Sequence, residues 1–145
     1  MRKTSIRRGQ RGVDVPQTRR SGGGGRQGGR HLVFVYGTLK RGFSNHFFLG
    51  RACFVGCGQT VERFALYVDE YPGVYPGEPV SRVQGEVYAV NEAMLARLDA
   101  LEDHPTLYRR EEVEVALDDG LVVKAWIYFY PHRGGRLVEG GEFRP

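Results

Sequence analysis

Apolar residues in this chain occur in short runs separated by glycine, proline and charged residues. Runs of this length, rich in valine and aromatic residues, are typical of β-strands. We expect strands at residues 32–36, 52–57, 63–68, 83–90, 112–117 and 122–130. Asp118-Asp119-Gly120 between the last two predicts a hairpin turn, and the two Tyr-Pro-Gly steps within residues 71–77 predict an irregular loop.

One segment has helical periodicity, and it predicts a helix from about residue 92 to residue 103. Its apolar face consists of Met94, Leu95, Leu98 and Leu101. Asn91 is the predicted N-cap, Glu92 suits the positive end of the helix dipole, and Pro105 ends the helix. Several strands with one helix, rather than regular βαβ units, predict an α+β fold with a mixed, barrel-like sheet and few helices.

The predicted helix carries one carboxylate on its apolar side. At 100° per residue, Glu102 falls between Leu95 and Leu98 around the helix axis. Asp99 and Asp103 are expected to face solvent instead. Burial raises the pKa of a glutamate from its reference of about 4.3 toward neutrality, where the group can act as a base and then as an acid.

Two structural explanations of Glu102 stay open at this point. One is a buried ion pair, for which Arg109, Arg110 and Lys124 are the candidate cations. The other is a last helical turn that frays into solvent. Either arrangement would account for the position of Glu102 without any catalytic role.

A second feature lies where the first predicted strand, LVFVY at residues 32–36, ends in Gly37 and Thr38. Glycine lets the backbone approach a ligand closely or adopt a positive φ. Main-chain N–H groups that point the same way after such a turn form a site for a carboxylate or a small anion, although an ordinary structural turn has the same sequence. Together with Glu102, the turn predicts a site that needs neither a metal nor an organic cofactor.

Two motifs resemble a known family. LVFVYGTLKRG at residues 32–42, followed by Asn45 and His46, resembles the opening of the γ-glutamylcyclotransferase superfamily, nearest to its γ-glutamylamine cyclotransferase (AIG2-like) branch. Residues 85–90 resemble the next strand of that family. LDALE at residues 98–102, with Pro105 and LYRR at residues 107–110, resembles the segment that bears its catalytic glutamate. The similarity extends over about residues 32–130.

The resemblance implies a barrel-like α+β fold and an intramolecular cyclisation. The free α-amine of a γ-glutamyl compound attacks its own γ-carbonyl carbon, which gives 5-oxoproline and a released amine. Glu102 would then be the general base and acid. The glutamyl portion would be bound, mostly through backbone groups, by Tyr36, Gly37, Thr38 and Leu39.

Other residues extend this hypothesis. Tyr108 is expected either to shape the pocket and hydrogen-bond the substrate or to pack in the core. Asn45 and His46 match the family pattern and are expected to support the turn. Tyr71 and Tyr75 are hypothesised to cover the side of the pocket from which the amine leaves.

The chain has 145 residues, which suits a single domain, and a formal net charge of +4. Residues 1–30 carry nine Lys or Arg residues and one acid, with four consecutive glycines, so we expect a disordered basic tail before a domain at residues 31–145. The tail lacks aromatic residues that would stack on bases, which argues against nucleic acid as a partner. No apolar run is long enough to span a membrane or to form a secretory signal.

Cys53 and Cys57 are the two cysteines, and they indicate a reduced, cytoplasmic protein rather than a disulfide scaffold. They lie in an apolar segment, where we expect core positions, and a zinc site would need two further ligands. The sequence therefore predicts an enzyme that acts on a γ-glutamylamine, including ε-(γ-glutamyl)-lysine compounds, or on a γ-glutamyl-amino acid. The alternatives are a non-catalytic binding module of the same fold, a cyclotransferase for another γ-glutamyl group, and a nucleic-acid-associated protein led by its basic tail.

Overall fold

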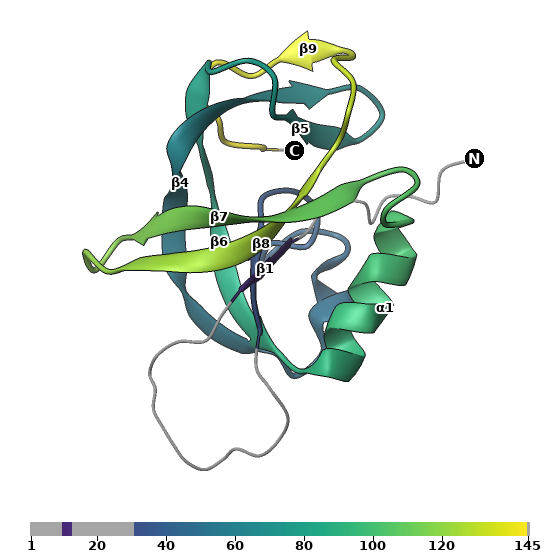
Figure 1. Cartoon of the computed structure of the whole chain (residues 1–145), viewed down its shortest axis with the longest axis vertical. Coiled ribbons are helices and arrows are strands. Elements are labelled where there is room, and N and C mark those ends of the chain that lie inside the picture. Colours follow the sequence, from purple (N-terminus) through teal and green to yellow (C-terminus); the bar gives the residue numbers. More distant parts are fainter. Residues whose placement is uncertain (1–9, 13–30, 145) are drawn as a thin grey trace.

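The computed structural model describes residues 10–12 and 31–144 (Figure 1). This part of the chain forms a sheet of eight strands with one α-helix packed at its side, and the predicted α+β class is confirmed. In chain order the elements are β1 (Gln10–Gly12), β3 (His31–Val35), the 3-10 helix η3 (His46–Leu49), β4 (Cys53–Val68), β5 (Pro72–Tyr75), β6 (Ser81–Val90), α1 (Glu92–Glu102), β7 (Arg109–Leu117), β8 (Val122–Phe129) and β9 (Arg136–Leu137).

The sheet closes on itself. Its order is β1-β3-β6-β4-β5-β8-β7, with β9 on β4, and further pairings join β3 to β8 and β4 to β7. The β3–β8 pairing is parallel and brings Val33 opposite Trp126, whereas β7 and β8 form the antiparallel hairpin that Asp118-Asp119-Gly120 predicted. Because β3 pairs with β6 and also with β8, the barrel-like sheet expected from the sequence is present.

Strand β3 is buried on both faces, which explains its uninterrupted apolar sequence. Successive side chains of a strand point to opposite faces. Leu32, Phe34 and Tyr36 lie in the cluster enclosed by the barrel strands. Val33 and Val35 instead belong to the cluster that includes the apolar face of α1. The strand therefore separates two cores, and it ends at Val35.

A pair of glycines lets the strands approach closely below the end of β3. Gly58 of β4 and Gly85 of β6 are directly paired. A Cβ on Gly85 would lie 2.4 Å from the carbonyl oxygen of Val35, and one on Gly58 would lie 2.5 Å from that of Ala116. Larger side chains at these two positions would push β3 and β7 away from the strands beneath them.

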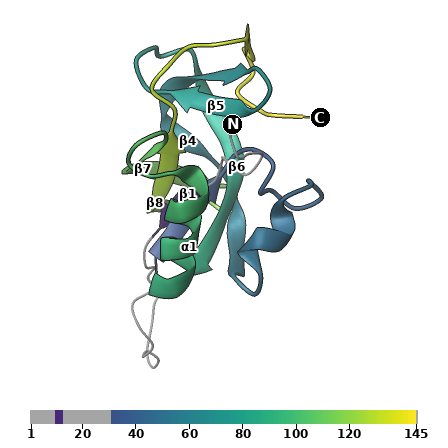
Figure 2. The ribbon, with the colours of Figure 1, turned by 90° about the vertical axis from the view of Figure 1, so that its right-hand side faces the viewer.

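Helix α1 begins and ends close to the predicted residues. The Asn91 side chain accepts a hydrogen bond of 2.8 Å from the Met94 N–H, which confirms the N-cap. The helix ends at Glu102 because Asp103 adopts a left-handed conformation with φ of 56°. Figure 2 shows α1 on one side of β6 and the segment that contains η3 on the other.

Two strand predictions were wrong in the middle of the chain. The strands expected at residues 52–57 and 63–68 are one strand, β4, whose pairing with β6 is interrupted by register shifts between Phe54 and Gly56 and between Gln59 and Arg63. The loop expected at residues 71–77 contains β5, which pairs with β4 and with Phe129 of β8. Proline is tolerated in β5 because it occupies the first position of the strand.

Strand β1 lies within the segment predicted to be disordered. Arg11 pairs with Val33 of β3 and with Trp126 of β8, so these three residues differ from the prediction. A short strand such as β1 can join a sheet through backbone hydrogen bonds alone, without apolar side chains. A prediction based on amino-acid composition does not detect such a strand. Residues 1–9 and 13–30 of the predicted tail lie outside the described residues. No helix in the described residues is long and apolar enough to cross a membrane.

Candidate active site

Glu102 is the last residue of α1, and its side chain is fully buried at 0% exposure. The other buried residues of the helix are Met94, Leu95 and Leu98. The prediction that Glu102 faces inward is therefore confirmed, and the alternative of a last turn frayed into solvent is wrong. Tyr128 of β8 is close enough for the negative charge of Glu102 to contribute to raising the pKa of its phenol.

Arg110, one of the cations considered as a partner of Glu102, forms a bidentate ion pair with Asp99. Its Nε and Nη2 donate to the two carboxylate oxygens of Asp99 at 2.7 and 2.8 Å. The Tyr128 hydroxyl donates to the same carboxylate at 2.5 Å, and the Arg110 guanidinium lies 4.3 Å from the ring centre of Trp126. The prediction that Asp99 faces solvent was wrong, because its partners come from β7 and β8.

These contacts keep Tyr128 protonated. Burial raises the pKa of the Tyr128 phenol well above its usual value, and the neighbouring Asp99 carboxylate adds to that rise. The neutral Tyr128 phenol gives its one O–H to Asp99 and carries no charge beside Glu102. The sequence reasoning missed Asp99, Arg110 and Tyr128 as a group, since they are distant in the chain.

The turn after β3 is held by the two residues predicted to support it. The Asn45 N–H and Nδ2 donate to the carbonyl and hydroxyl oxygens of Thr38, each at 2.9 Å. Nδ1 of His46 lies 2.9 Å from the Leu39 carbonyl oxygen. The Lys40 N–H closes the turn on the Gly37 carbonyl at 3.1 Å. These contacts confirm the supporting role of Asn45 and His46.

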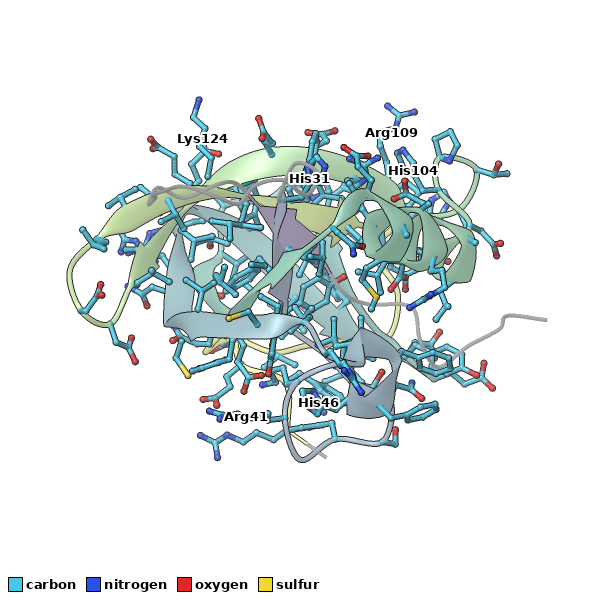
Figure 3. All side chains as sticks on the ribbon, turned by 90° about the horizontal axis from the view of Figure 1, so that it is seen from below. His31, Arg41, His46, His104, Arg109 and Lys124 are labelled. Carbon is cyan, nitrogen blue, oxygen red and sulfur yellow. The ribbon has the colours of Figure 1, made fainter. Side chains whose placement is uncertain are left out.

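Tyr36 joins the end of β3 to two other strands. Its hydroxyl donates to the Tyr128 carbonyl oxygen at 2.8 Å and accepts from the Val74 N–H at 3.3 Å. Leu39 is also fully buried, in the cluster that contains Leu98 of α1. The turn and the helix therefore meet through buried side chains. Figure 3 shows the outer parts of these regions on opposite sides of the molecule, with Arg41 and His46 below and His104 and Arg109 above.

Glu86 of β6 is a further part of the site that the sequence reasoning missed. Its Oε1 accepts 2.8 Å and 3.0 Å hydrogen bonds from the Arg41 N–H and the Tyr88 hydroxyl. Burial raises the pKa of Tyr88, so that its hydroxyl remains a donor. The sequence feature that could have drawn attention to Glu86 is its position as a carboxylate within an apolar strand. A main-chain N–H just after the turn thus already binds a carboxylate from within the protein.

Lys40 is 6% exposed, and burial lowers the pKa of its ammonium group. Its Nζ donates to the Phe143 carbonyl oxygen at 3.1 Å and lies 5.0 Å from the ring centre of Phe43. The Phe43 and Phe143 rings are 5.6 Å apart. The segment near the end of the chain therefore packs against the turn.

Tyr108 connects the helix end to a pocket. Its N–H donates to the Glu102 carbonyl oxygen at 3.3 Å, and its hydroxyl donates to the Pro72 carbonyl oxygen at 3.4 Å. The pocket has a volume of about 210 Å³ and is lined by Tyr67, Asp69, Glu70, Tyr71, Gly73, Tyr108, Tyr130, His132, Arg133 and Gly134. It brings together two of the predicted residues, Tyr71 and Tyr108. Glu102 and residues 36–39 are not among those that line it.

The cysteine prediction was wrong as regards burial. Cys53 and Cys57 are both exposed, since their positions in β4 point away from the barrel core. The Cys57 thiol is partly shielded from water, and this burial is the main cause that raises its pKa. Within the described residues, no three His, Cys, Asp or Glu side chains are grouped so as to hold a metal ion.

Comparison with known proteins agrees with this architecture. The profile of the family described as "Gamma-glutamyl cyclotransferase, AIG2-like" matches residues 33–145. A protein of Methanocaldococcus jannaschii, named "Putative gamma-glutamylcyclotransferase MJ1514", is 48% identical over 113 residues, which are 77% of this chain and 94% of that protein. The human gamma-glutamylaminecyclotransferase is 44% identical over 96 residues, 59% of this chain and 62% of the human protein.

Solved structures give the same result. The crystal structure of a mouse AIG2-like protein has a TM-score of 0.69 and 34% sequence identity, and the match covers 78% of this chain and 87% of the mouse chain. An uncharacterised protein of Pyrococcus horikoshii has a TM-score of 0.64 and 29% identity, over 77% of this chain and 88% of that one. The closed sheet is thus that of a gamma-glutamyl cyclotransferase. The chain belongs to the AIG2-like gamma-glutamyl cyclotransferase family.

Proposed function

We propose that this enzyme converts a γ-glutamylamine or a γ-glutamyl-amino acid into 5-oxoproline and the free amine, with Glu102 as general base and acid. The observation that carries the proposal is the complete burial of Glu102 at the end of α1 in a chain of this family. A carboxyl group that is shielded from bulk water and meets a substrate amine can accept a proton from it and later give one to the departing nitrogen.

The reaction needs proton transfer because an α-ammonium group cannot attack a carbonyl. Glu102 accepts a proton from this nitrogen, and the free amine then forms the ring bond to the γ-carbonyl carbon. The bond from that carbon to the departing nitrogen breaks. Two protons in all pass from the attacking nitrogen to the departing one, and Glu102 carries them in turn, so that no protein nucleophile or cofactor is consumed.

Binding of the glutamyl portion is assigned to Tyr36, Gly37, Thr38 and Leu39, mostly through backbone groups. The support is that Asn45 and His46 hold this turn in one conformation. A fixed turn can keep the flexible glutamyl chain folded toward a ring, and such positioning supplies a large part of the rate of an intramolecular reaction. Tyr108 is assigned to the same site because its backbone is bonded to that of Glu102.

The test is the Glu102→Gln variant, assayed for 5-oxoproline release from γ-glutamyl compounds with different amines. Glutamine keeps the shape of the side chain but cannot take up the proton, so we expect kcat to fall by at least about 100-fold. The matched control is Asp103→Asn at the next, exposed residue, where asparagine suits the left-handed conformation. The control should cyclise at the wild-type rate.

Circular dichroism of both variants establishes that the fold is retained. Release by Glu102→Gln within a few-fold of the wild type would remove Glu102 from the mechanism. Binding of γ-glutamyl compounds by the wild type without any 5-oxoproline release would instead favour the non-catalytic binding module.

A further inference from the structure

We propose that the pocket beside Tyr108 binds a positively charged group on the departing amine, so that γ-glutamyl derivatives of alkyl diamines are preferred over those of neutral amines. This inference rests on the proposed function, since it names the leaving group of the same reaction. It concerns a part of the molecule that Glu102 and the turn do not line.

The first argument is the aromatic lining of the pocket. Four tyrosines contribute to it, namely Tyr67, Tyr71, Tyr108 and Tyr130. The rings of Tyr108 and Tyr130 are 4.9 Å apart and inclined at 40°, so they form one wall. Aromatic faces attract ammonium groups through their negative electrostatic surface, and they also cover the methylene groups of an alkyl chain.

The second argument is charge. The positive charge of Arg133 is already paired, because its Nη1 donates to Glu78 at 2.9 Å, and the Tyr67 hydroxyl donates to the other oxygen of that carboxylate at 2.6 Å. Asp69 and Glu70 have no such cation within the described residues. Since Arg133 is paired with Glu78, which lies outside the lining, the Asp69 and Glu70 carboxylates leave two uncompensated negative charges at the pocket.

The third argument is location. Tyr108 is one of the residues that line the pocket, and its backbone N–H donates to the carbonyl oxygen of Glu102, the residue proposed to protonate the departing nitrogen. The other lining residues come from the end of β4, the loop after it, the start of β5 and the segment after β8, which runs toward β9 in Figure 1. A leaving group that extends from Glu102 past Tyr108 would therefore place its far end in this pocket.

Size limits the kind of amine. A volume of about 210 Å³ is below the range of roughly 300–1,000 Å³ typical of sites for drug-sized ligands. It suits a short alkylammonium chain. A carboxylate on the same leaving group would lie near Asp69 and Glu70, without a free cation among the lining residues, so a diamine fits better than an amino acid.

The experiment compares two substrates with the same four-carbon chain, γ-glutamyl-1,4-diaminobutane and γ-glutamyl-butylamine, at pH 8 and low ionic strength. We expect kcat/KM to be about 10-fold higher for the diamine, a difference of about 1.4 kcal/mol. In the Asp69→Asn, Glu70→Gln double variant this ratio should fall toward about 1, chiefly through a lower kcat/KM for the diamine compound. Equal kcat/KM for the two substrates in the wild type would overturn the inference.

The control double variant is Glu62→Gln, Asp118→Asn, which removes two exposed acids outside the pocket. It should keep the wild-type preference for the diamine. Loss of that preference in the control as well would show that the net charge of the protein, and not the pocket, causes it, and would overturn the inference. If neither substrate is cyclised, the proposed function fails while the pocket is still testable with free 1,4-diaminobutane. Calorimetry should then show tighter binding to the wild type than to Asp69→Asn, Glu70→Gln, and equal binding would overturn the inference.

Discussion

His104 follows the helix that carries Glu102, and its ring contributes to the stability of the junction between α1 and β7. Its Nδ1 accepts a 3.0 Å hydrogen bond from the Arg110 N–H, which requires that nitrogen to be unprotonated. Burial is the main cause that lowers the pKa of His104 in the folded protein. The neutral form is therefore favoured on folding.

The sign of the pH dependence follows from this shift. When the folded pKa is lower than the unfolded value of about 6.5, the contribution to stability is complete above that value and is lost as the pH falls through the folded pKa. We expect His104→Asn, whose side-chain oxygen can accept from Arg110, to flatten the decline of the unfolding free energy below about pH 6.5. Urea titrations of both proteins from pH 5 to pH 8 measure the difference, and parallel profiles would contradict it.

At the residue scale, the sequence predicted which way a side chain faces better than it predicted which residues that side chain contacts. The angular position of Glu102 on the helix followed from its spacing to Leu95 and Leu98, and its burial agrees. The prediction for Asp99 was wrong because the angular positions of residues on the helix give no information about Arg110 or Tyr128. Partners that arrive from other strands can convert an apparently exposed acid into an enclosed one.

At the scale of elements, α1 depends on its N-cap. Asn91 satisfies the Met94 N–H, one of the donors that a helix leaves without an intrahelical partner. Replacing Asn91 with alanine should lower the unfolding free energy by about 1 kcal/mol, whereas Asn91→Asp should preserve the cap. Chemical denaturation of the three proteins gives the values. An alanine variant as stable as the aspartate variant would mean that the cap contributes little.

The elements that sequence patterns identified are those specified by local features. The helix has a cap and a periodic face, and the β7–β8 hairpin has a turn sequence of its own. β5 was missed because its backbone becomes a strand only by pairing with β4 and β8. The length of β4 was underestimated because its irregular residues, 55 and 60–62, interrupt the pairing with β6 but not the strand.

At the scale of the whole molecule, closure of the sheet determines where the candidate site lies. The resemblance of two motifs identified the family and the fold, but neither motif contains the contacts that join them. Tyr128 supplies those contacts. Its carbonyl oxygen accepts a hydrogen bond from the Tyr36 hydroxyl, and its phenol lies near Glu102. Contacts between residues 92 positions apart are not encoded in any local pattern, so the geometry of the site could not have been predicted from the sequence by periodicity.

The last segment of the chain completes this arrangement at the turn. The Gln84 N–H donates to the Gly141 carbonyl oxygen at 2.8 Å, and Lys40 donates to that of Phe143 at 3.1 Å. Deleting residues 141–145 would leave the buried Lys40 ammonium without this acceptor. We expect the unfolding free energy to fall by about 1–3 kcal/mol and KM for γ-glutamyl substrates to rise, because the turn loses a support.

Lys40→Met in the shortened protein separates the two contributions. Methionine has no donor to leave unpaired, so the substitution should recover part of the lost stability, while the rise in KM should persist because the segment is still absent. Thermal unfolding and initial-rate measurements on the full-length, shortened and shortened Lys40→Met proteins give both quantities. A shortened protein with unchanged stability and KM would show that the segment does not support the turn, and failure of methionine to recover stability would assign the loss to packing of Phe143 on Phe43 instead.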